Sequence, residues 1–526
     1  MAMNTRSLLT ATLVMTSGIA VAGDHGDIFS TCGTDAVAQP RELSGAGILV
    51  ADALEYRLTD EHIAALNIYQ KEMLLNFERE VYKGNIAPHV CLHPDTDPKV
   101  AEAFEIFLND LWFANNPNAF ILSTRWTNTA TNGSGLSQGD PTTLTYSFAP
   151  DGTNIQGEGA SNLISFMNNQ IGDGTWQPLF QTALDAWSLN AGLTYVFEPN
   201  DDARTISGGG SAGVLGVRGD VRIGGNFLDG NSGVLAFNFF PNGGDMVIDT
   251  GDGNFYGNGS GNFIRLRNVV THEAGHGIGL SHVESDSNNF LMEPFINTSF
   301  TGPQIDDVRG AQRGYGDVDE NNNSIATASD LAGLALGGSG FVGGNFKIIN
   351  FRSIDDNSDV DFYSVPTAEP VTMTVSLDPA GGSYQFTGEN GGGGGAFFNA
   401  NAVLDLEFSV RDANNNVIVN VDNTAAGFSE FASVELPEPG QYYIVIDSNN
   451  TNNIQLWNLT VLFATLDVPD ECPADFTGEG DLNFLDVSAF LTAFGNQDAI
   501  ADFTGEGDFN FLDVSAFLTA FGNGCP

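Results

Sequence analysis

Residues 271 to 282 constrain the fold more than any other segment, because they read Thr-His-Glu-Ala-Gly-His-Gly-Ile-Gly-Leu-Ser-His. His272 and His276 are four positions apart, so on a helix they share one face and can reach one metal ion. Gly279 permits a turn that a side chain would obstruct, and this turn returns His282 as a third ligand. Three protein ligands leave a fourth position for water, which marks a catalytic zinc site, and Glu273 can take a proton from that water.

The alternative is that these histidines are core or surface residues that bind no metal. The chain has 7 histidines, and three of them fall in this short segment at ligand spacing. The complete pattern therefore favours zinc.

Charge and length restrict the remaining possibilities. The 526 residues include 66 acidic and 18 basic side chains, a formal net charge of -48. Nucleic acid and anionic membrane surfaces need a Lys/Arg footprint, so they are disfavoured as partners. The length exceeds one ordinary core of about 100 to 200 residues, so several domains are expected.

The N-terminus is typical of an exported protein. Arg6 precedes an apolar run that ends in Ala20-Val21-Ala22, a small-residue cleavage site. No later segment is apolar over the roughly 20 residues that a membrane helix needs. We expect a signal peptide and a secreted protein, which could be anchored at the cell surface. An oxidising compartment favours disulfides within each half of the chain, namely Cys472 with Cys525 and Cys32 with Cys91.

Hydrophobic periodicity divides the chain into regions. Apolar residues recur at helical spacing in Ala51 to Val81 and in Val100 to Trp112. Strand-like runs and a helix over Pro178 to Asn190 then indicate an α+β domain. Alternating runs such as Val371 to Leu377 next predict an antiparallel β-sandwich. The expected regions are a signal peptide (1–22), a helical N-terminal region that is a candidate pro-region (23–119), the α+β domain (120–316), the sandwich (317–464), a linker (465–471) and a C-terminal module (472–526).

The C-terminal module is a duplication. Ala474 to Asn496 and Ala501 to Asn523 are identical except for Leu482 and Phe509. Each copy has oxygen donors at the spacing of a calcium-binding EF-hand loop, with Gly at the sharp turn, and then runs into one helix. The alternative is a disulfide-tied helical cap without metal. The candidate calcium ligands are Asp475, Thr477, Glu479, Asp481, Asn483 and Asp486, and their copies Asp502, Thr504, Glu506, Asp508, Asn510 and Asp513.

Beyond the histidines, the chain resembles the matrixin family of metzincin peptidases. Met292 stands in Leu-Met-Glu-Pro, where a metzincin places the methionine turn beneath its metal. Ala186-Trp187-Ser188, Gly219 to Ile223 and Asp306 to Gln312 are similar to matrixin helices and strands. The resemblance implies a metzincin fold over residues 120–316 and zinc-dependent hydrolysis of peptide bonds, with Glu273 passing the proton to the leaving amine.

The resemblance also bears on other metals. Phe237 and Val247 stand where many matrixins carry the histidines of a structural zinc, so we expect one zinc only. The resemblance implies calcium ligands at four aspartates, although aspartates in Gly-rich loops also form simple turns. These aspartates are Asp220, Asp245, Asp249 and Asp252.

Cys91-Leu92-His93-Pro94-Asp95 partly resembles the matrixin cysteine switch, in which a thiolate occupies the open zinc position. His89 and Val90 replace the expected Pro-Arg before it. A disulfide between Cys32 and Cys91 explains the same residue without regulation, so both interpretations stay open.

The last two regions carry resemblances of their own. Asp355 to Tyr363 and Pro439 to Tyr443 are similar to pre-peptidase C-terminal domains, whose acids either hold calcium or form solvated turns. The duplicated module resembles a dockerin of the GC type, which binds cohesin-like partners. The chain is thus predicted to be a secreted metalloendopeptidase docked through its C-terminal module. The alternatives are a non-catalytic binding or scaffold protein that retains the zincin fold, and a metalloenzyme that acts on a carbohydrate-associated substrate.

Overall fold

A computed structural model of the chain describes residues 54–55, 57–82, 88–112, 124–285, 289–331, 346–388, 396–449, 452–465 and 472–524. The signal peptide, Cys32 and Cys525 lie outside these residues, as do most of the predicted linker and the loop Gly391 to Gly395. The chain from Ala53 onward forms one compact unit. Among the described helices, none is long and apolar enough to span a bilayer.

The N-terminal region is helical, as its periodicity predicts, but it also contains a strand. Its helices are α2 (Asp60–Ala65), α3 (Ile68–Tyr82) and α4 (Pro98–Trp112), and strand β1 (His89–Leu92) lies between α3 and α4. Thr59 caps α2 by accepting a hydrogen bond from the backbone N–H of His62. All four residues of β1 are buried, so this short segment is part of the core.

The central domain is built on a six-stranded sheet in the order β1-β9-β10-β8-β4-β7. The strands β4, β7, β8 and β10 are parallel, and β9 is antiparallel to both β10 and β1. The domain therefore has an α/β arrangement with a mixed sheet instead of the expected α+β arrangement, and the N-terminal region supplies the edge strand. The strands span Thr142–Phe148 (β4), Leu193–Phe197 (β7), Val221–Asn226 (β8), Val234–Asn238 (β9) and Met246–Asp249 (β10).

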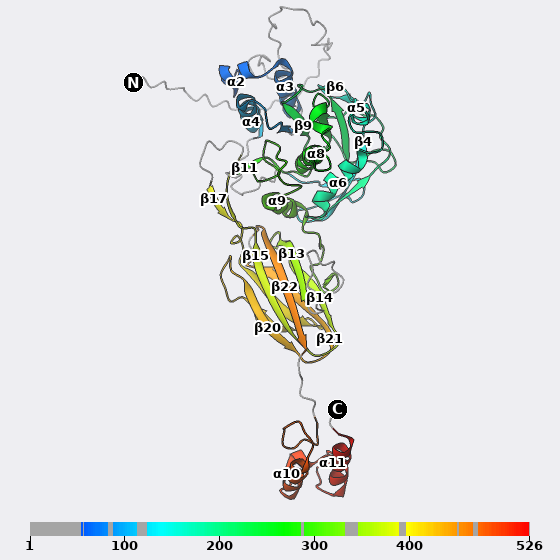
Figure 1. Cartoon of the computed structure of the whole chain (residues 1–526), viewed down its shortest axis with the longest axis vertical. Helices are drawn as coiled ribbons and strands as arrows, with labels where there is room; N and C mark the ends of the chain where they lie inside the picture. The colour runs from blue at the N-terminus through cyan, green and yellow to red at the C-terminus, as the bar shows by residue number, and fades with distance from the viewer. Residues whose placement is uncertain are drawn as a thin grey trace, which may run out of the picture. The chain divides into compact units, whose positions relative to one another are not determined.

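Helices and short strands complete this domain (Figure 1). The helices are α5 (Leu163–Gln170), α6 (Gln177–Ser188), α7 (Gly253–Tyr256), α8 (Ile264–Gly277) and α9 (Ile305–Tyr315). The short strands are β2 (Asn128–Thr129) with β3 (Gly133–Ser134), β5 (Asn154–Ile155) with β6 (Gly159–Ala160), and β11 (Val283–Ser285).

Apolar clusters cover both faces of the sheet. Alternate residues of a strand point to opposite faces, so Met246 and Ile248 belong to one cluster and Val247 to the other. The first cluster includes Trp187 on α6 and residues of α8. The second contains the N-terminal helices, where the ring of Phe77 lies 5.3 Å from that of Phe237. The N-terminal region therefore packs on one face of the sheet.

The next region is a sandwich of two sheets, as predicted. One sheet has the order β12-β14-β21-β18-β19 and the other β13-β22-β15-β20, with the buried Trp457 and Tyr363 in the core. A hairpin leaves this sandwich and joins β11 of the central domain in a three-stranded sheet. The strands are β12 (Ser329–Asp330), β13 (Phe346–Ile354), β14 (Asp361–Thr367), β15 (Val371–Ala380), β16 (Ser383–Gly388), β17 (Ala396–Asn399), β18 (Leu406–Asp412), β19 (Val417–Val421), β20 (Glu430–Leu436), β21 (Gly440–Ser448) and β22 (Gln455–Thr465).

The C-terminal module consists of α10 (Phe484–Gly495), a short 3-10 helix (Ala499–Ala501) and α11 (Phe511–Asn523). Phe490 and Phe517, equivalent residues of the two copies, stack with ring centroids 4.0 Å apart. Cys472 is disulfide-bonded, and its predicted partner Cys525 lies outside the described residues.

Candidate active site

Helix α8 and the turn after it bring the three histidines together. The Nε2 atom of His276 lies 3.1 Å from those of His272 and His282, and the latter two are 3.2 Å apart. Gly279, at φ 106, provides the left-handed turn that returns His282 to the helix. Zinc at about 2.0 to 2.1 Å from tetrahedrally arranged nitrogens separates them by about 3.3 Å. The triad therefore has nearly the spacing of a zinc site.

The hydrogen bonds of the rings also favour a metal. The Nδ1 atoms of His272 and His276 lie 2.7 and 2.6 Å from the carbonyl oxygens of Leu291 and Leu280. A carbonyl only accepts, so both rings carry their proton on Nδ1 and present an Nε2 lone pair. Burial lowers the pKa of His272 to about 4 and those of His276 and His282 well below the usual value. Neutral rings with converging lone pairs are the donor set that zinc prefers.

Met292 packs against helix α8, which carries the first two histidines. A Cβ atom added at Gly275 would come within 2.3 Å of the Met292 sulfur, so helix α8 needs glycine there. The backbone N–H groups of Leu291 and Met292 donate to the Asp307 carboxylate at 2.8 and 3.0 Å. Helix α9 thereby fixes the turn that holds His272.

Cys91 has a free, buried thiol, so its interpretation as a disulfide partner of Cys32 is contradicted. Strand β1 pairs with the sheet edge at β9 and brings the Cys91 sulfur within 4.8 Å of a ring nitrogen of His272 and a carboxylate oxygen of Glu273. Burial raises the pKa of Glu273 well above its usual value, and the backbone N–H of Cys91 opposes that shift. The thiol therefore lies where the cysteine-switch interpretation places it.

Sequence reasoning missed His89 as a site residue. Its ring stacks on that of His282 with centroids 5.0 Å apart, and it lies 5.2 Å from the ring of His276. His89 and Cys91 are two apart on β1, so the alternation of a strand is the signal that places both beside the histidines.

Comparisons with known proteins agree with this geometry. Residues 163–316 match the model of the matrixin peptidase family. The chain contains a matrixin domain. Matrix metalloproteinase-25 of Mus musculus is 36% identical over 109 residues, which cover 19% of this chain and 17% of that protein. Matrix metalloproteinase-16 of Homo sapiens is 29% identical over 161 residues, or 29% of this chain and 25% of that protein. The chain thus spans a quarter or less of the length of these relatives.

The solved structures that match part of this chain are only distantly similar to it. The pre-peptidase C-terminal domain of a collagenase from Bacillus anthracis is 13% identical, with a TM-score of 0.16. That match covers 23% of this chain and 91% of that domain. The two-sheet architecture of the sandwich follows from its own strand order.

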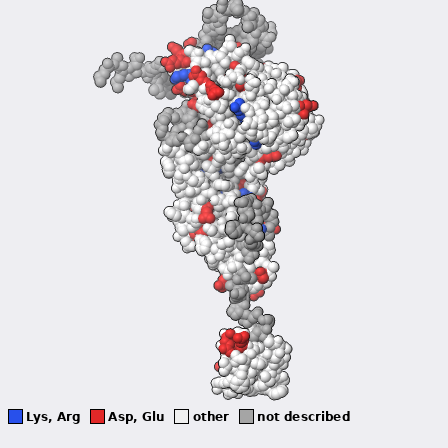
Figure 2. All heavy atoms as spheres, viewed as in Figure 1, with Lys and Arg blue, Asp and Glu red and all other residues white. Residues whose placement is uncertain are grey.

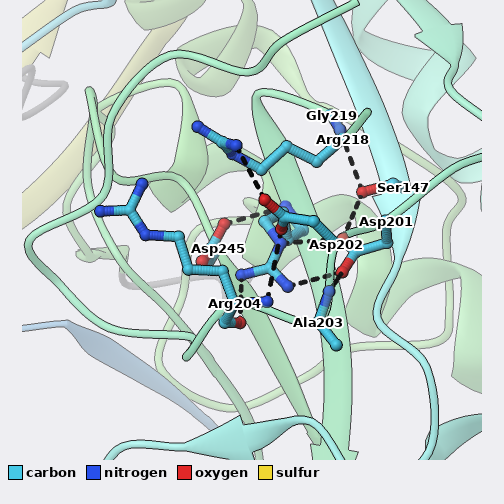
Figure 3. A network of polar contacts seen from close by, with 9 residues as sticks. Ser147, Asp201, Asp202, Ala203, Arg204, Arg218, Gly219 and Asp245 are labelled. Atoms are coloured by element: carbon cyan, nitrogen blue, oxygen red, sulfur yellow. Dashed lines mark hydrogen bonds and ion pairs between the residues drawn. The ribbon is translucent and has the colours of Figure 1, made fainter. Parts of the chain in front are cut away.

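The four predicted calcium ligands in the matrixin domain all accept hydrogen bonds from protein donors. The carboxylate of Asp220 accepts hydrogen bonds from the backbone of Ala130 and Gly213 and from both donors of Thr145. Asp245 accepts from the backbone N–H of Arg222 at 2.9 Å, within a network that Figure 3 shows from close by.

The centre of this network is the Arg222 guanidinium. It forms two hydrogen bonds to Asp201, at 2.8 and 2.6 Å, and donates to the Arg204 carbonyl at 2.6 Å. A buried cation thus lies beside two acids of this network, Asp201 and Asp245.

The other two predicted ligands, Asp249 and Asp252, lie in a different cluster. It also contains Asp229, which the sequence analysis did not identify and whose side chain accepts from Gln70 of α3 at 2.8 Å. Burial raises the pKa of Asp249 to about 7 and that of Asp252 to about 6, with Asp229 adding repulsion. One oxygen each of Asp229 and Asp252 has no hydrogen-bond partner. These carboxylates fit a hard cation.

Phe237 and Val247 are buried in the cluster formed with the N-terminal helices. Apolar packing therefore occupies the two positions at which many matrixins carry zinc-binding histidines. Neither side chain offers a metal ligand.

A further acidic cluster lies where the sandwich meets the matrixin domain. Oxygen atoms of Glu320, Asp359 and Asp361 lie within 4.8 Å of one another, and Asp355 lines the same cavity. Asp361 is fully buried, and neither of its oxygens has a hydrogen-bond partner. Burial and mutual repulsion raise the pKa of Glu320 to about 10, that of Asp355 to about 9 and that of Asp359 to about 7.

The two loops of the C-terminal module have matching geometry. In the first loop, Asp475 accepts from the backbone of Gly478 and Gly480, and Asp486 accepts from Thr477 and from the backbone of Asn483. The second loop repeats these contacts at Asp502 and Asp513. Figure 2 shows acidic side chains gathered at one end of this module. In each loop, the carboxylates at the first and last ligand positions thus accept hydrogen bonds from backbone N–H groups of their own loop.

Proposed function

We propose that the chain is a zinc-dependent endopeptidase. The observation that carries this proposal is the convergence of three neutral imidazole nitrogens, 3.1 to 3.2 Å apart, beside a buried Glu273. Zinc bound there would acidify a water molecule and polarise the peptide carbonyl. Glu273 would accept the proton of that water and deliver it to the leaving amine.

The rival functions are a scaffold and an enzyme for carbohydrate-associated substrates. A non-catalytic scaffold does not require a carboxylate beside three metal ligands. The presence of Glu273 therefore disfavours the scaffold function. Incubating the zinc-loaded protein with a peptide library, with and without a chelator, tests the proposal. Chelator-sensitive cleavage mapped by mass spectrometry supports it, and intact peptides together with cleaved glycopeptide linkages would favour the carbohydrate-associated alternative.

We further propose that β1 keeps the enzyme latent. The Cys91 sulfur lies within 4.8 Å of a His272 ring nitrogen, and the ring of His89 stacks on that of His282. Strand β1, which carries both residues, occupies the edge of the sheet at β9. A peptide chain recognises such an edge by adding a strand, so β1 and a substrate would compete for it.

Replacing Cys91 with Ser is expected to raise the activity of the unprocessed chain, because the weaker oxygen donor holds β1 less firmly over zinc. The initial rate of peptide cleavage before any proteolytic processing measures this effect. Cys472 is a poor control because it is disulfide-bonded, so Ser281→Ala, near the site but outside β1, serves instead. An unchanged rate in Cys91→Ser would exclude the thiol as the latch.

Calcium completes the proposed cofactors. The candidate sites are the cluster of Asp229, Asp249 and Asp252, the cluster around Asp361, and the two C-terminal loops. The first two contain several buried carboxylates close together, and oxygen-rich sites of this kind suit calcium.

Adding calcium to the metal-free protein is expected to tighten the C-terminal loops and raise the helicity of α10 and α11. Backbone N–H groups donate to Asp475 and Asp486, and calcium would draw these carboxylates onto one centre. Circular dichroism at 222 nm during a calcium titration checks this result, with magnesium as the control. Equal responses to both ions would contradict a calcium-specific module.

We also propose that the C-terminal module docks onto a cohesin-like protein. Phe484 and Phe511, equivalent residues at the starts of α10 and α11, are 80% and 78% exposed. Duplicated apolar side chains on a small module suit a protein partner. Calorimetric binding to a cohesin panel tests this, with the double variant Phe484→Ala and Phe511→Ala as the negative control. Secretion, and attachment at the cell surface through this module, follow as parts of the same proposal.

A further inference from the structure

The hairpin β16–β17 belongs to the sandwich by sequence but to the active-site region by contact. Its strand β16 pairs antiparallel with β11, with Val283 opposite Gly388 and Ser285 opposite Phe386. Strand β11 begins directly after His282. The hairpin therefore extends the segment that leaves the last zinc ligand.

Tyr384 anchors this hairpin on helix α9. Its hydroxyl donates to the Asp306 carboxylate and accepts from Arg309 Nη1 at 3.1 Å. The Arg309 guanidinium lies 4.6 Å from the ring of Phe398 on β17, and the Tyr384 ring lies 4.9 Å from that of Phe290. Asp306 and Arg309 are both 1% exposed, so the hairpin seals a buried ion pair. Charged groups this deeply buried strongly favour a single geometry for their partners.

Asp307, the residue after Asp306 on α9, connects the anchored hairpin to the zinc ligands. Asp307 accepts the backbone N–H groups of Leu291 and Met292, and the Leu291 carbonyl holds the Nδ1 of His272 at 2.7 Å. On the other side of the same segment, the Ser285 backbone and hydroxyl donate to Glu293. The stretch from β11 to the methionine turn is thus fixed at both ends by contacts that involve the hairpin or α9.

We infer that the sandwich is a working part of the active site, and that Tyr384 is a positioning residue for the zinc ligands. The inference rests on the proposed peptidase function but concerns how this chain builds the site. The partner groups of ligand histidines fix ring orientation and metal affinity, and rigid support of a site has large effects on rate.

Two variants test the inference in the full chain. Tyr384→Phe removes the hydroxyl that bridges Asp306 and Arg309, and it is expected to lower kcat by about three- to tenfold with a smaller change in KM. In the second variant, residues 383–399 are replaced by Asn-Gly, which favours a tight turn. The Ala400 N–H already donates to the Gly382 carbonyl at 2.9 Å, so the ends can be joined without strain. This variant should lose about 100-fold in kcat/KM.

Zinc affinity, measured by competition with a chromophoric chelator, supplies a readout that does not need activity. We expect it to fall by about tenfold or more in the hairpin replacement. Tyr442→Phe is the matched control, because its hydroxyl donates to the Glu438 carbonyl within the sandwich. If the hairpin replacement does not fold, the kcat and the zinc affinity of Tyr384→Phe alone test the inference.

The outcomes separate the inference from the function on which it rests. Unchanged kcat and zinc affinity in Tyr384→Phe and in a folded hairpin replacement would overturn the inference while leaving the peptidase proposal intact. A wild-type protein without peptidase activity, in which these variants still lose zinc affinity, would overturn the peptidase proposal and support the inference.

Discussion

Replacing Glu273 with Gln is expected to lower the rate of peptide cleavage by about 100- to 10,000-fold, the usual contribution of a general acid–base group. Glutamine has nearly the same shape but cannot accept the proton of the attacking water. The three histidines are unaffected, so the variant should still bind one zinc ion per chain. Steady-state kinetics and metal analysis of the same preparation measure both quantities.

The cleavage rates of Glu273→Gln and its parent are best compared in proteins that also carry Cys91→Ser. In that background β1 no longer lowers the parent rate. Glu284→Gln, eleven positions further along, is a control that changes the same residue type outside the triad. A Glu273→Gln variant with more than a tenth of the parent rate would show that this carboxylate is not the base. Loss of zinc from the Glu273→Gln variant would show that Glu273 has a structural role at the site.

Calcium is expected to stabilise the junction between the matrixin domain and the sandwich, and more strongly at pH 8 than at pH 5. Without calcium, the raised pKa values of Glu320, Asp355 and Asp359 mean that the folded chain holds protons more tightly than the unfolded chain. Their stabilising contribution is present below about pH 4. It is lost progressively as the pH rises from about 4 to the raised pKa of each group, at up to about 1.4 kcal/mol per pH unit for each of them.

Bound calcium would compensate the charge of the ionised carboxylates and so prevent the loss of stability at high pH. At 100 times its dissociation constant, one ion adds about 2.7 kcal/mol to the free energy of unfolding. Thermal unfolding of the zinc-free protein at both pH values, in calcium or in sodium chloride of equal ionic strength, measures the effect. Asp361→Asn should reduce the response to calcium, and the exposed Asp422→Asn should not. A calcium response that is equal at both pH values would contradict the buried cluster as its source.

The sequence sufficed for the zinc ligands because their geometry is local. A helix places His272 and His276 one turn apart, and a glycine turn returns His282 within a few residues. Met292 could be predicted only through the family resemblance, because its position beneath the metal depends on Gly275 of another segment.

Contacts between distant segments could not be predicted in the same way. Strand β1 is only four residues long and lies between helices, so no periodicity distinguishes it, and its pairing with β9 places Cys91 and His89 at the site. Asp229 joins Asp249 and Asp252 only after folding. Asp245 instead lies beside Arg222, and Asp220 accepts hydrogen bonds from Thr145. Spacing along the chain does not reveal which acids will have a basic neighbour.

Cleavage of a peptide substrate by the Cys91→Ser protein, titrated with zinc from the metal-free state, tests the central claim most directly. The proposal predicts a rate that rises in proportion to added zinc, reaches its maximum at one equivalent and disappears in a matched His276→Ala variant. A rate that does not depend on zinc, or the absence of any cleavage once one equivalent is bound, would contradict it.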